Sequence, residues 1–251
     1  MTEMTRDSTR AAATPTIGQV TLIGLFVTAL VTAQLTASKI LGFSLPFELP
    51  VVGAQLALPG AALAYAVTFL ASDCYAELYG RRAAQVMVNV GFAMNFVLLA
   101  LVWSTIAAPV APNSQVAADT FATVLGASTN IVIASLLAYV VSQNWDVLVF
   151  HRLREYTDGD HLWLRNIGST ASSQAIDTVI FVTVGFAIAP AILGNGDVPG
   201  IGLLASLIVG QYLLKLLIAV VDTPVVYAIV GAVREYDLDG AALDSAGRTG
   251  D

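Results

Sequence analysis

Long stretches without any charged residue restrict this chain to a small set of folds. No Asp, Glu, Lys or Arg occurs in residues 83–118 or in residues 120–145. A helix that crosses a lipid bilayer needs about 20 consecutive, mostly apolar residues, and both stretches exceed that length. The chain as a whole is 57% hydrophobic and only 12% charged. We therefore expect an all-α membrane protein rather than a soluble domain.

The alternation of apolar runs and breaks predicts six transmembrane helices. They are expected at about residues 17–41, 59–79, 82–107, 120–150, 166–193 and 200–233. Between the first two helices, residues 42–58 alternate apolar and polar side chains and contain prolines, which predicts a short extended hairpin or a re-entrant loop. The transmembrane domain thus spans residues 17–233. It is preceded by a cytoplasmic tail, residues 1–16, and followed by an acidic tail, residues 234–251, that is expected to be disordered.

The distribution of basic residues predicts the orientation of these helices. The loops at 42–58, 107–119 and 194–200 contain no Lys or Arg, whereas all nine arginines lie in the tails or in the other two connections. Cytoplasmic loops of membrane proteins carry an excess of Lys and Arg. We therefore expect both termini in the cytoplasm, with the chain crossing the cell (plasma) membrane.

Charge and cysteine content narrow the range of partners. The formal net charge is −7, and Lys39 and Lys215 are the only lysines among eleven basic residues. This acidic balance argues against nucleic acid as a partner. A lysine-poor, acidic surface also suits a salt-loaded cytosol, which favours a halophilic archaeal source. Because Cys74 is the only cysteine, a disulfide framework or a cysteine metal site is excluded, and we expect no cofactor and no bound metal.

Two carboxylates lie near the end of the second predicted helix. Asp73 and Glu77 are four residues apart and so share one face of a helix, which Gly80 is expected to end. A carboxylate within a membrane helix normally faces the protein interior and has a partner or a ligand. Arg81 gives Glu77 a structural alternative, because a Glu–Arg pair at this spacing is favourable within one helix.

Polar side chains on three other predicted helices point to the same interior. Asp177 lies about twelve residues from the cytoplasmic Arg165, which places it near the middle of the membrane. Lys215 can neutralise either Asp177 or Asp73, or it can contact a ligand. Gln143 and Gln174 carry primary amides with several hydrogen-bond sites to satisfy, which favours a role in ligand contact.

An ordered set of short motifs connects these residues. In chain order they are Ser72-Asp73, Glu77-x-Tyr79-Gly80-Arg81-Arg82, Ser142-Gln143-x-x-Asp146, Leu164-Arg165-Asn166 with Ser169, Ser173-Gln174-x-x-Asp177-Thr178-x-x-Phe181, Lys215 and Asp222-Thr223-Pro224. The set resembles the queuosine precursor transporter family, part of a wider group of vitamin uptake transporters, over about residues 20–230. The resemblance implies a transporter, not an enzyme, that imports 7-deazaguanine precursors of modified tRNA bases in their 7-cyano or 7-aminomethyl form.

The chemistry of these side chains suits such a substrate. A 7-deazaguanine presents a ring N–H beside an exocyclic amine, and one carboxylate, of Asp177 or Asp73, can accept both donors. The amides suit the acceptor edge of the base, and an aromatic ring such as that of Phe181 or Tyr75 suits stacking. The candidate substrate-binding residues are therefore Asp73, Glu77, Gln143, Gln174, Asp177, Phe181 and Lys215.

Rival classes fit the sequence less well. Gly194-Asn-Gly-Asp197 matches one motif of aspartyl intramembrane proteases, but it lies in a loop and the second motif is missing. A substrate-binding membrane subunit of an ATP-driven vitamin importer is the main alternative. No Walker motif occurs here, so its ATPase would be a separate chain. The expected partners are a purine-like small molecule, the lipid bilayer and a coupling ion, proton or sodium. A homo-oligomer is compatible with the sequence.

Overall fold

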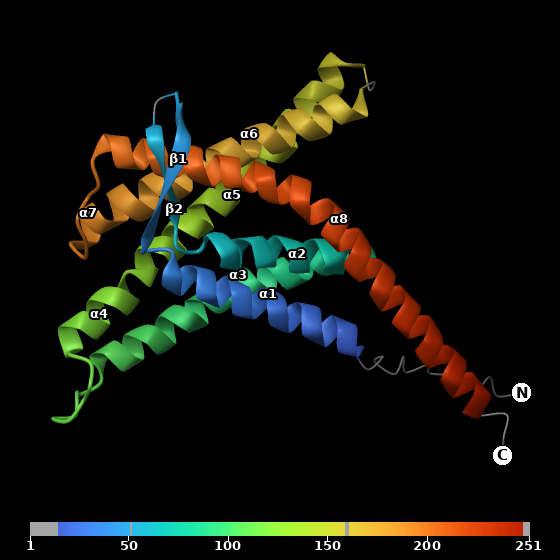
Figure 1. Ribbon diagram of the computed structural model, residues 1–251, viewed down its shortest axis with the longest axis horizontal. Helices are drawn as coiled ribbons and strands as arrows, with labels where there is room; N and C mark the ends of the chain where they lie inside the picture. Colours follow the sequence, from blue (N-terminus) through green and yellow to red (C-terminus); the bar gives the residue numbers. More distant parts are fainter. Residues whose placement is uncertain (1–14, 51, 159–160, 248–251) are drawn as a thin grey trace, which may run out of the picture.

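The computed structural model describes residues 15–50, 52–158 and 161–247 and is mostly helical (Figure 1). Its elements are α1 Ile17–Thr36, β1 Ile40–Leu49, β2 Gly53–Pro59, α2 Ala62–Tyr79, α3 Arg81–Ala107, α4 Ala118–Gly126, α5 Ser128–Tyr156, α6 Leu162–Thr183, the π-helical segment η1 Val184–Ile188, α7 Ala189–Leu193 and α8 Ile201–Gly247. Most of the predicted N-terminal tail lies outside the described residues.

Five helical stretches within the described residues are long and apolar enough to cross a membrane. They are Ile17–Thr36, Arg81–Ala107, Ala118–Tyr156, Ile167–Leu193 and Ile201–Glu235. Large apolar side chains on their outer faces are exposed, as at Leu101 (63%) and Val220 (72%), which suits contact with lipid. These findings confirm the prediction of a helical, multi-pass membrane protein. Helix α2 falls outside the five because Asp73 and Glu77 lower its hydropathy.

A two-stranded antiparallel pair connects α1 with α2. Strands β1 and β2 pair from Ile40 opposite Pro59 to Ser44 opposite Gln55, with an irregularity before Leu49 pairs with Gly53. The first predicted helix is therefore too long, since α1 ends at Thr36 and the chain is extended from Ile40.

Strand β2 docks on α8. The hydroxyl group of Ser206 on α8 accepts a hydrogen bond from the backbone N–H of Ala57 (2.9 Å) and donates one to the carbonyl oxygen of Gln55 (3.0 Å). Gly210 lies one turn further along α8, where a Cβ atom would come within 2.2 Å of the Ala57 carbonyl oxygen. The absence of a side chain at this position therefore lets the strand approach the helix.

Gly80 ends α2, as the sequence predicts. It adopts φ 89°, a conformation that residues with a Cβ rarely adopt, and α3 begins at the next residue. Arg81 therefore belongs to a different helix from Glu77, and the i,i+4 relation between them is broken.

Three predicted helices have different limits in the structure. The fourth is divided into α4 and α5, which meet at Ala127. The fifth is divided into α6, η1 and α7, with Pro190 at the start of α7. Proline cannot donate a helical hydrogen bond and crowds the preceding turn, which accounts for the π-helical segment before it. Helix α8 continues as helix past residue 233 to Gly247, where the sequence predicts a disordered tail.

Helix α8 links the two main parts of the fold. Figure 1 shows α5 and α6 as a long antiparallel pair, with α1, α2 and α3 grouped beside them. Helix α8 crosses both and contacts β2, α2 and α6. Two apolar clusters form the interior: one includes Phe26 and Met87 from the α1–α3 group, and the other includes Ile131 and Phe181 from the α5–α6 pair. Polar side chains line the space between these groups.

Candidate functional site

A buried ion pair joins α6 to α8. The ammonium group of Lys215 donates to Oδ2 of Asp177 at 2.5 Å, and the two side chains are only 5% and 14% exposed. The hydroxyl group of Ser142 on α5 donates to the other carboxylate oxygen of Asp177 at 3.3 Å. The structure thus assigns Lys215 to Asp177 rather than to Asp73, a choice that the sequence left open.

Three of the predicted site residues, Gln143, Gln174 and Asp177, line one groove of about 180 Å³, which we call the amide groove. Its complete lining is Phe26, Leu30, Tyr65, Thr68, Phe69, Ser72, Val88, Phe92, Tyr139, Ser142, Gln143, Gln174 and Asp177. Two amides and one carboxylate therefore face a common space. This space is otherwise enclosed by rings, aliphatic side chains and hydroxyl groups.

Five aromatic rings line the amide groove, those of Phe26, Tyr65, Phe69, Phe92 and Tyr139, and the sequence analysis assigned none of them to the site. Phe92 and Tyr139 are stacked, with ring centroids 4.3 Å apart and an interplanar angle of 28°. Tyr65 and Phe69 meet edge to face at 5.2 Å. A signal was present for the second pair, because Phe69 lies four residues before Asp73 and Tyr65 a further four, so all three share one face of α2.

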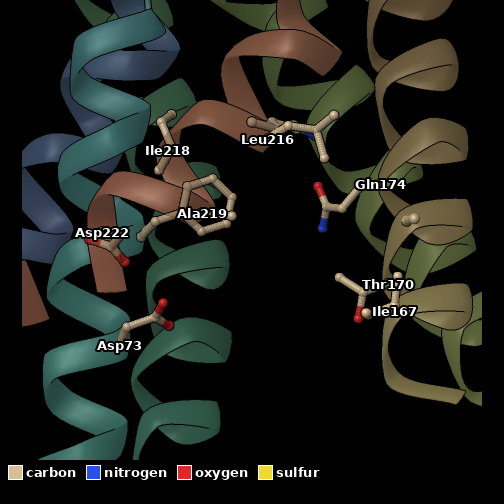
Figure 2. A pocket seen from close by; sticks show the side chains of 11 residues that line it. Asp73, Ile167, Thr170, Gln174, Leu216, Ile218, Ala219 and Asp222 are labelled. Carbon is tan, nitrogen blue, oxygen red and sulfur yellow. The ribbon is translucent and has the colours of Figure 1, made fainter. Parts of the chain in front are cut away.

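A larger cavity of about 420 Å³, which we call the main cavity, adjoins the amide groove at Gln174 (Figure 2). Its lining comes from α2, α6 and α8 and consists of Phe69, Asp73, Ile167, Thr170, Ala171, Gln174, Lys215, Leu216, Ile218, Ala219 and Asp222. Figure 2 shows Gln174 projecting from α6 across the cavity from Asp73 and Asp222. A mostly apolar cavity with a few convergent polar groups is the usual form of a small-molecule site.

Phe181 lies apart from the three residues of the amide groove. It is 8% exposed and contacts Phe186 edge to face, with ring centroids 6.1 Å apart. It lines a small space of about 20 Å³ together with Tyr65, Gln211 and Lys215. In this conformation the ring therefore closes one end of the site and has no open face for stacking.

Glu77 pairs with a different arginine from the one predicted. Its carboxylate accepts a hydrogen bond from Arg234 on α8 at 3.3 Å, and the side chains of Glu77 and Arg234 are 52% and 58% exposed. The predicted pairing with Arg81 is wrong because Gly80 ends the helix between the two residues. Glu77 and Arg81 both line a third cavity, which also contains Asp73 and Asp222 and which we call the vestibule.

Because the Glu77–Arg234 pair is exposed, it should contribute little to stability. Exposed ion pairs contribute about 0–1 kcal/mol. We expect Glu77→Gln to lower the free energy of unfolding by less than about 1 kcal/mol, measured by thermal unfolding in detergent beside Arg234→Gln. A loss several times larger in both variants would contradict this assignment.

Hydrogen bonds cross between two copies of one short motif. The pattern Ser-Gln-x-x-Asp occurs at 142–146 on α5 and at 173–177 on α6. Ser142 of the first copy donates to Asp177 of the second at 3.3 Å, and Ser173 of the second donates to Asp146 of the first at 3.2 Å. Each serine thus positions the carboxylate of the other helix, so the two copies of the motif together join α5 to α6.

Comparison with known proteins places most of the membrane region in one family. A family model described as "Putative vitamin uptake transporter" matches residues 59–229. A similar protein is the "Probable queuosine precursor transporter" of Bacillus subtilis (strain 168), which is 33% identical over 166 residues, covering 65% of this chain and 68% of the relative. No solved structure matches the chain. The region matched by the family model includes α2, α3, α5 and α6 and most of α8. These helices carry all seven candidate substrate-binding residues that the sequence predicted.

Proposed function

This chain belongs to the vitamin uptake transporter family, and from that premise we propose that it imports a 7-deazaguanine precursor of queuosine-type or archaeosine-type tRNA bases across the cell membrane. The relative from Bacillus subtilis is named for a queuosine precursor. The observation that carries the proposal is the amide groove, where Gln143, Gln174 and Asp177 face a space lined by aromatic rings. This donor and acceptor set matches a guanine-like edge and the flat ring that bears it.

In this proposal Asp177 binds the donor edge of the base. Its carboxylate already accepts hydrogen bonds from Ser142 and Lys215, but a carboxylate offers about four lone-pair positions. The ring N–H and the exocyclic amine of the precursor use the remaining ones. Lys215 and Ser142 fix the orientation of the carboxylate, and so the groove is prepared before the substrate arrives.

The remaining groove residues supply the other edge and the faces of the base. The amides of Gln143 and Gln174 donate to its carbonyl and ring acceptors. The Phe92–Tyr139 stack and the Tyr65–Phe69 pair offer aromatic surface to the ring. Phe181 closes the opposite end, while Asp73 and Glu77 lie toward the main cavity and the vestibule, where the substrate passes rather than rests.

Binding and uptake by purified protein test the proposal. Protein in lipid vesicles without ATP should take up radiolabelled 7-cyano-7-deazaguanine, and excess unlabelled 7-aminomethyl-7-deazaguanine or guanine should show by competition which ring substituent is preferred. Uptake without ATP supports secondary transport. Binding without uptake would instead favour the alternative, a substrate-binding membrane subunit of an ATP-driven importer. Absence of binding for both precursors would refute the proposed substrate.

We further propose six spans, with α2 as the sixth and with both termini in the cytoplasm. The arginine-free connections, at the β1–β2 pair, between α3 and α4 and beside α7, lie toward one end of the molecule in Figure 1, and the start of α1 and the end of α8 lie toward the other. The main cavity includes Ile167 and Thr170 from the first turns of α6. In the proposed orientation it therefore opens toward the cytoplasm.

Cysteine labelling from outside the cell tests the orientation. Asn113→Cys and Asp197→Cys, both at exposed positions, should react with a membrane-impermeant maleimide in intact cells. Glu155→Cys, at an exposed position near the end of α5, should react only after the cells are opened. The unsubstituted protein is the control, because Cys74 is fully buried. The reverse pattern of labelling would overturn the proposed orientation.

A further inference from the structure

Asp73 and Asp222 meet between α2 and α8. Both line the main cavity and the vestibule, and Figure 2 shows them on the same wall of the main cavity, from neighbouring helices. The two carboxyl groups are neighbours in this wall and are near enough to interact directly. Asp222 was not among the predicted substrate-binding residues.

No basic side chain among the described residues pairs with either carboxyl group. Lys215 pairs with Asp177, and Arg234 pairs with Glu77. Asp222 is only 9% exposed, whereas Asp73 is exposed on the cavity side. The buried carboxyl group of Asp222 thus has no cation beside it among the described residues to neutralise it. A buried carboxylate without a partner is costly, and so this position requires a positive charge or a proton.

The other groups that face this pair are few. The titratable or charged side chains around it are Cys74 and Glu77 on α2, Arg81 on α3, and Lys215 and Tyr227 on α8. Helix α6 faces the pair across the main cavity only with uncharged side chains such as Thr170 and Gln174. Arg81 lines the vestibule, but within the described residues it forms no ion pair with Asp73 or Asp222.

Two carboxyl groups can form a hydrogen bond with each other only when one of them holds a proton, because an ionised carboxylate is solely an acceptor. We propose that Asp73 and Asp222 share one proton and that this pair carries the proton that drives uptake. The inference rests on the proposed transport function and adds its energy source. It assigns coupling to a pair separate from Asp177, the residue proposed to bind the substrate.

The position of the pair suits this role. It borders the main cavity, where Gln174 and Lys215 connect to the substrate site, and it borders the vestibule, through which the proton leaves. Pro224 follows Asp222 by two residues within α8. Because proline leaves the carbonyl of Val220 without its helical partner, α8 can bend beside the pair when the shared proton is bound or released.

Transport in vesicles separates coupling from substrate binding. The uncharged precursor 7-cyano-7-deazaguanine is the probe, so that pH acts on the protein and not on the ligand. With one proton per substrate, a gradient of one pH unit supports about tenfold accumulation. The native protein should approach this value when the outside is acidic. Asp222→Asn and Asp73→Asn should exchange labelled for unlabelled precursor but should not accumulate it above equilibrium.

Two comparisons make this result specific. Asp119→Asn, at an exposed carboxylate at the start of α4, should accumulate precursor like the native protein. Infrared spectra should show the carbonyl band of a protonated carboxylic acid in the native protein, and this band should be lost in both Asp73→Asn and Asp222→Asn. The infrared band requires no substrate, so it tests the pair even if the proposed precursor does not bind.

The proposal has clear contrary outcomes. Full accumulation in both Asn variants would overturn it, as would accumulation driven by a sodium gradient without a pH gradient. If the carboxylic acid band persists in both Asn variants, the pair holds no proton. Failure of the native protein to bind the precursor, with the band present, would refute the proposed substrate alone.

Discussion

Replacing Asp177 by Asn should abolish precursor uptake and also destabilise the protein. The amide offers one acceptor where the carboxylate offers two, and its N–H groups oppose both the donor edge of the substrate and the ammonium group of Lys215. Removing one partner of a buried ion pair costs about 3–5 kcal/mol, because the other charge stays buried and unpaired. The measurement is uptake per amount of folded protein, together with thermal unfolding in detergent.

A double variant separates the two effects. Asp177→Asn combined with Lys215→Met removes both charges and keeps a side chain of similar length, which should restore most of the lost stability. Uptake should nonetheless stay absent, because the donor edge of the substrate no longer has the Asp177 carboxylate to bind. Recovery of both stability and uptake would show that the pair has only a structural role, and Asp177 would then have to be removed from the proposed site.

Among the glycine-to-alanine substitutions in α8, Gly210→Ala should lower the stability of the protein most. The new Cβ would lie 2.2 Å from the backbone carbonyl oxygen of Ala57, and Leu56 and Leu58 are also within 3.2 Å of it. A backbone atom cannot move aside alone, so β2 must shift from α8 and the Ser206 hydrogen bonds must lengthen. Overpacking of this kind costs about 1–3 kcal/mol. Thermal unfolding should show a clear decrease in Tm.

Gly231→Ala is the matched control on the same helix. A Cβ at this position meets nothing within 4 Å, and alanine favours a helix over glycine by about 0.8–1 kcal/mol. This variant should therefore unfold at the same temperature as the native protein or slightly higher. Equal Tm values for Gly210→Ala and Gly231→Ala would mean that β2 does not rest on α8 as the structure shows.

The sequence was sufficient to predict features that depend on local chemistry. The charge-free runs predicted membrane helices because bilayer thickness sets their length, and Gly80 predicted the end of α2 because it can adopt a positive φ. The grouping of Gln174 with Asp177 was also predictable, since residues three apart share a face of one helix. Each of these inferences needs only a short segment of chain.

Features that depend on helix packing could not be predicted in the same way. Lys215 had two candidate partners, and only the contact of α6 with α8 selects Asp177. Phe181 follows helical spacing along α6, yet the neighbouring apolar side chains enclose its ring away from the amide groove. Glu77 and Arg81 lie on different helices because Gly80, with its positive φ, ends α2. Glu77 pairs instead with Arg234, which is distant in sequence. The pairing of Asp222 with Asp73 likewise requires two helices to meet.

The crossed Ser–Asp hydrogen bonds constrain how this transporter can change conformation. Because Ser142 holds Asp177 and Ser173 holds Asp146, sliding or rotation of α5 against α6 would break both bonds at once. We therefore expect these two helices to rock as one rigid body, with Gln143 and Gln174 at a fixed separation throughout the cycle. The moving boundary then lies between this body and α2 with α8. Along it, the Lys215–Asp177 ion pair and the hydrogen bond from the Tyr212 hydroxyl group to the Ala171 carbonyl oxygen would have to break.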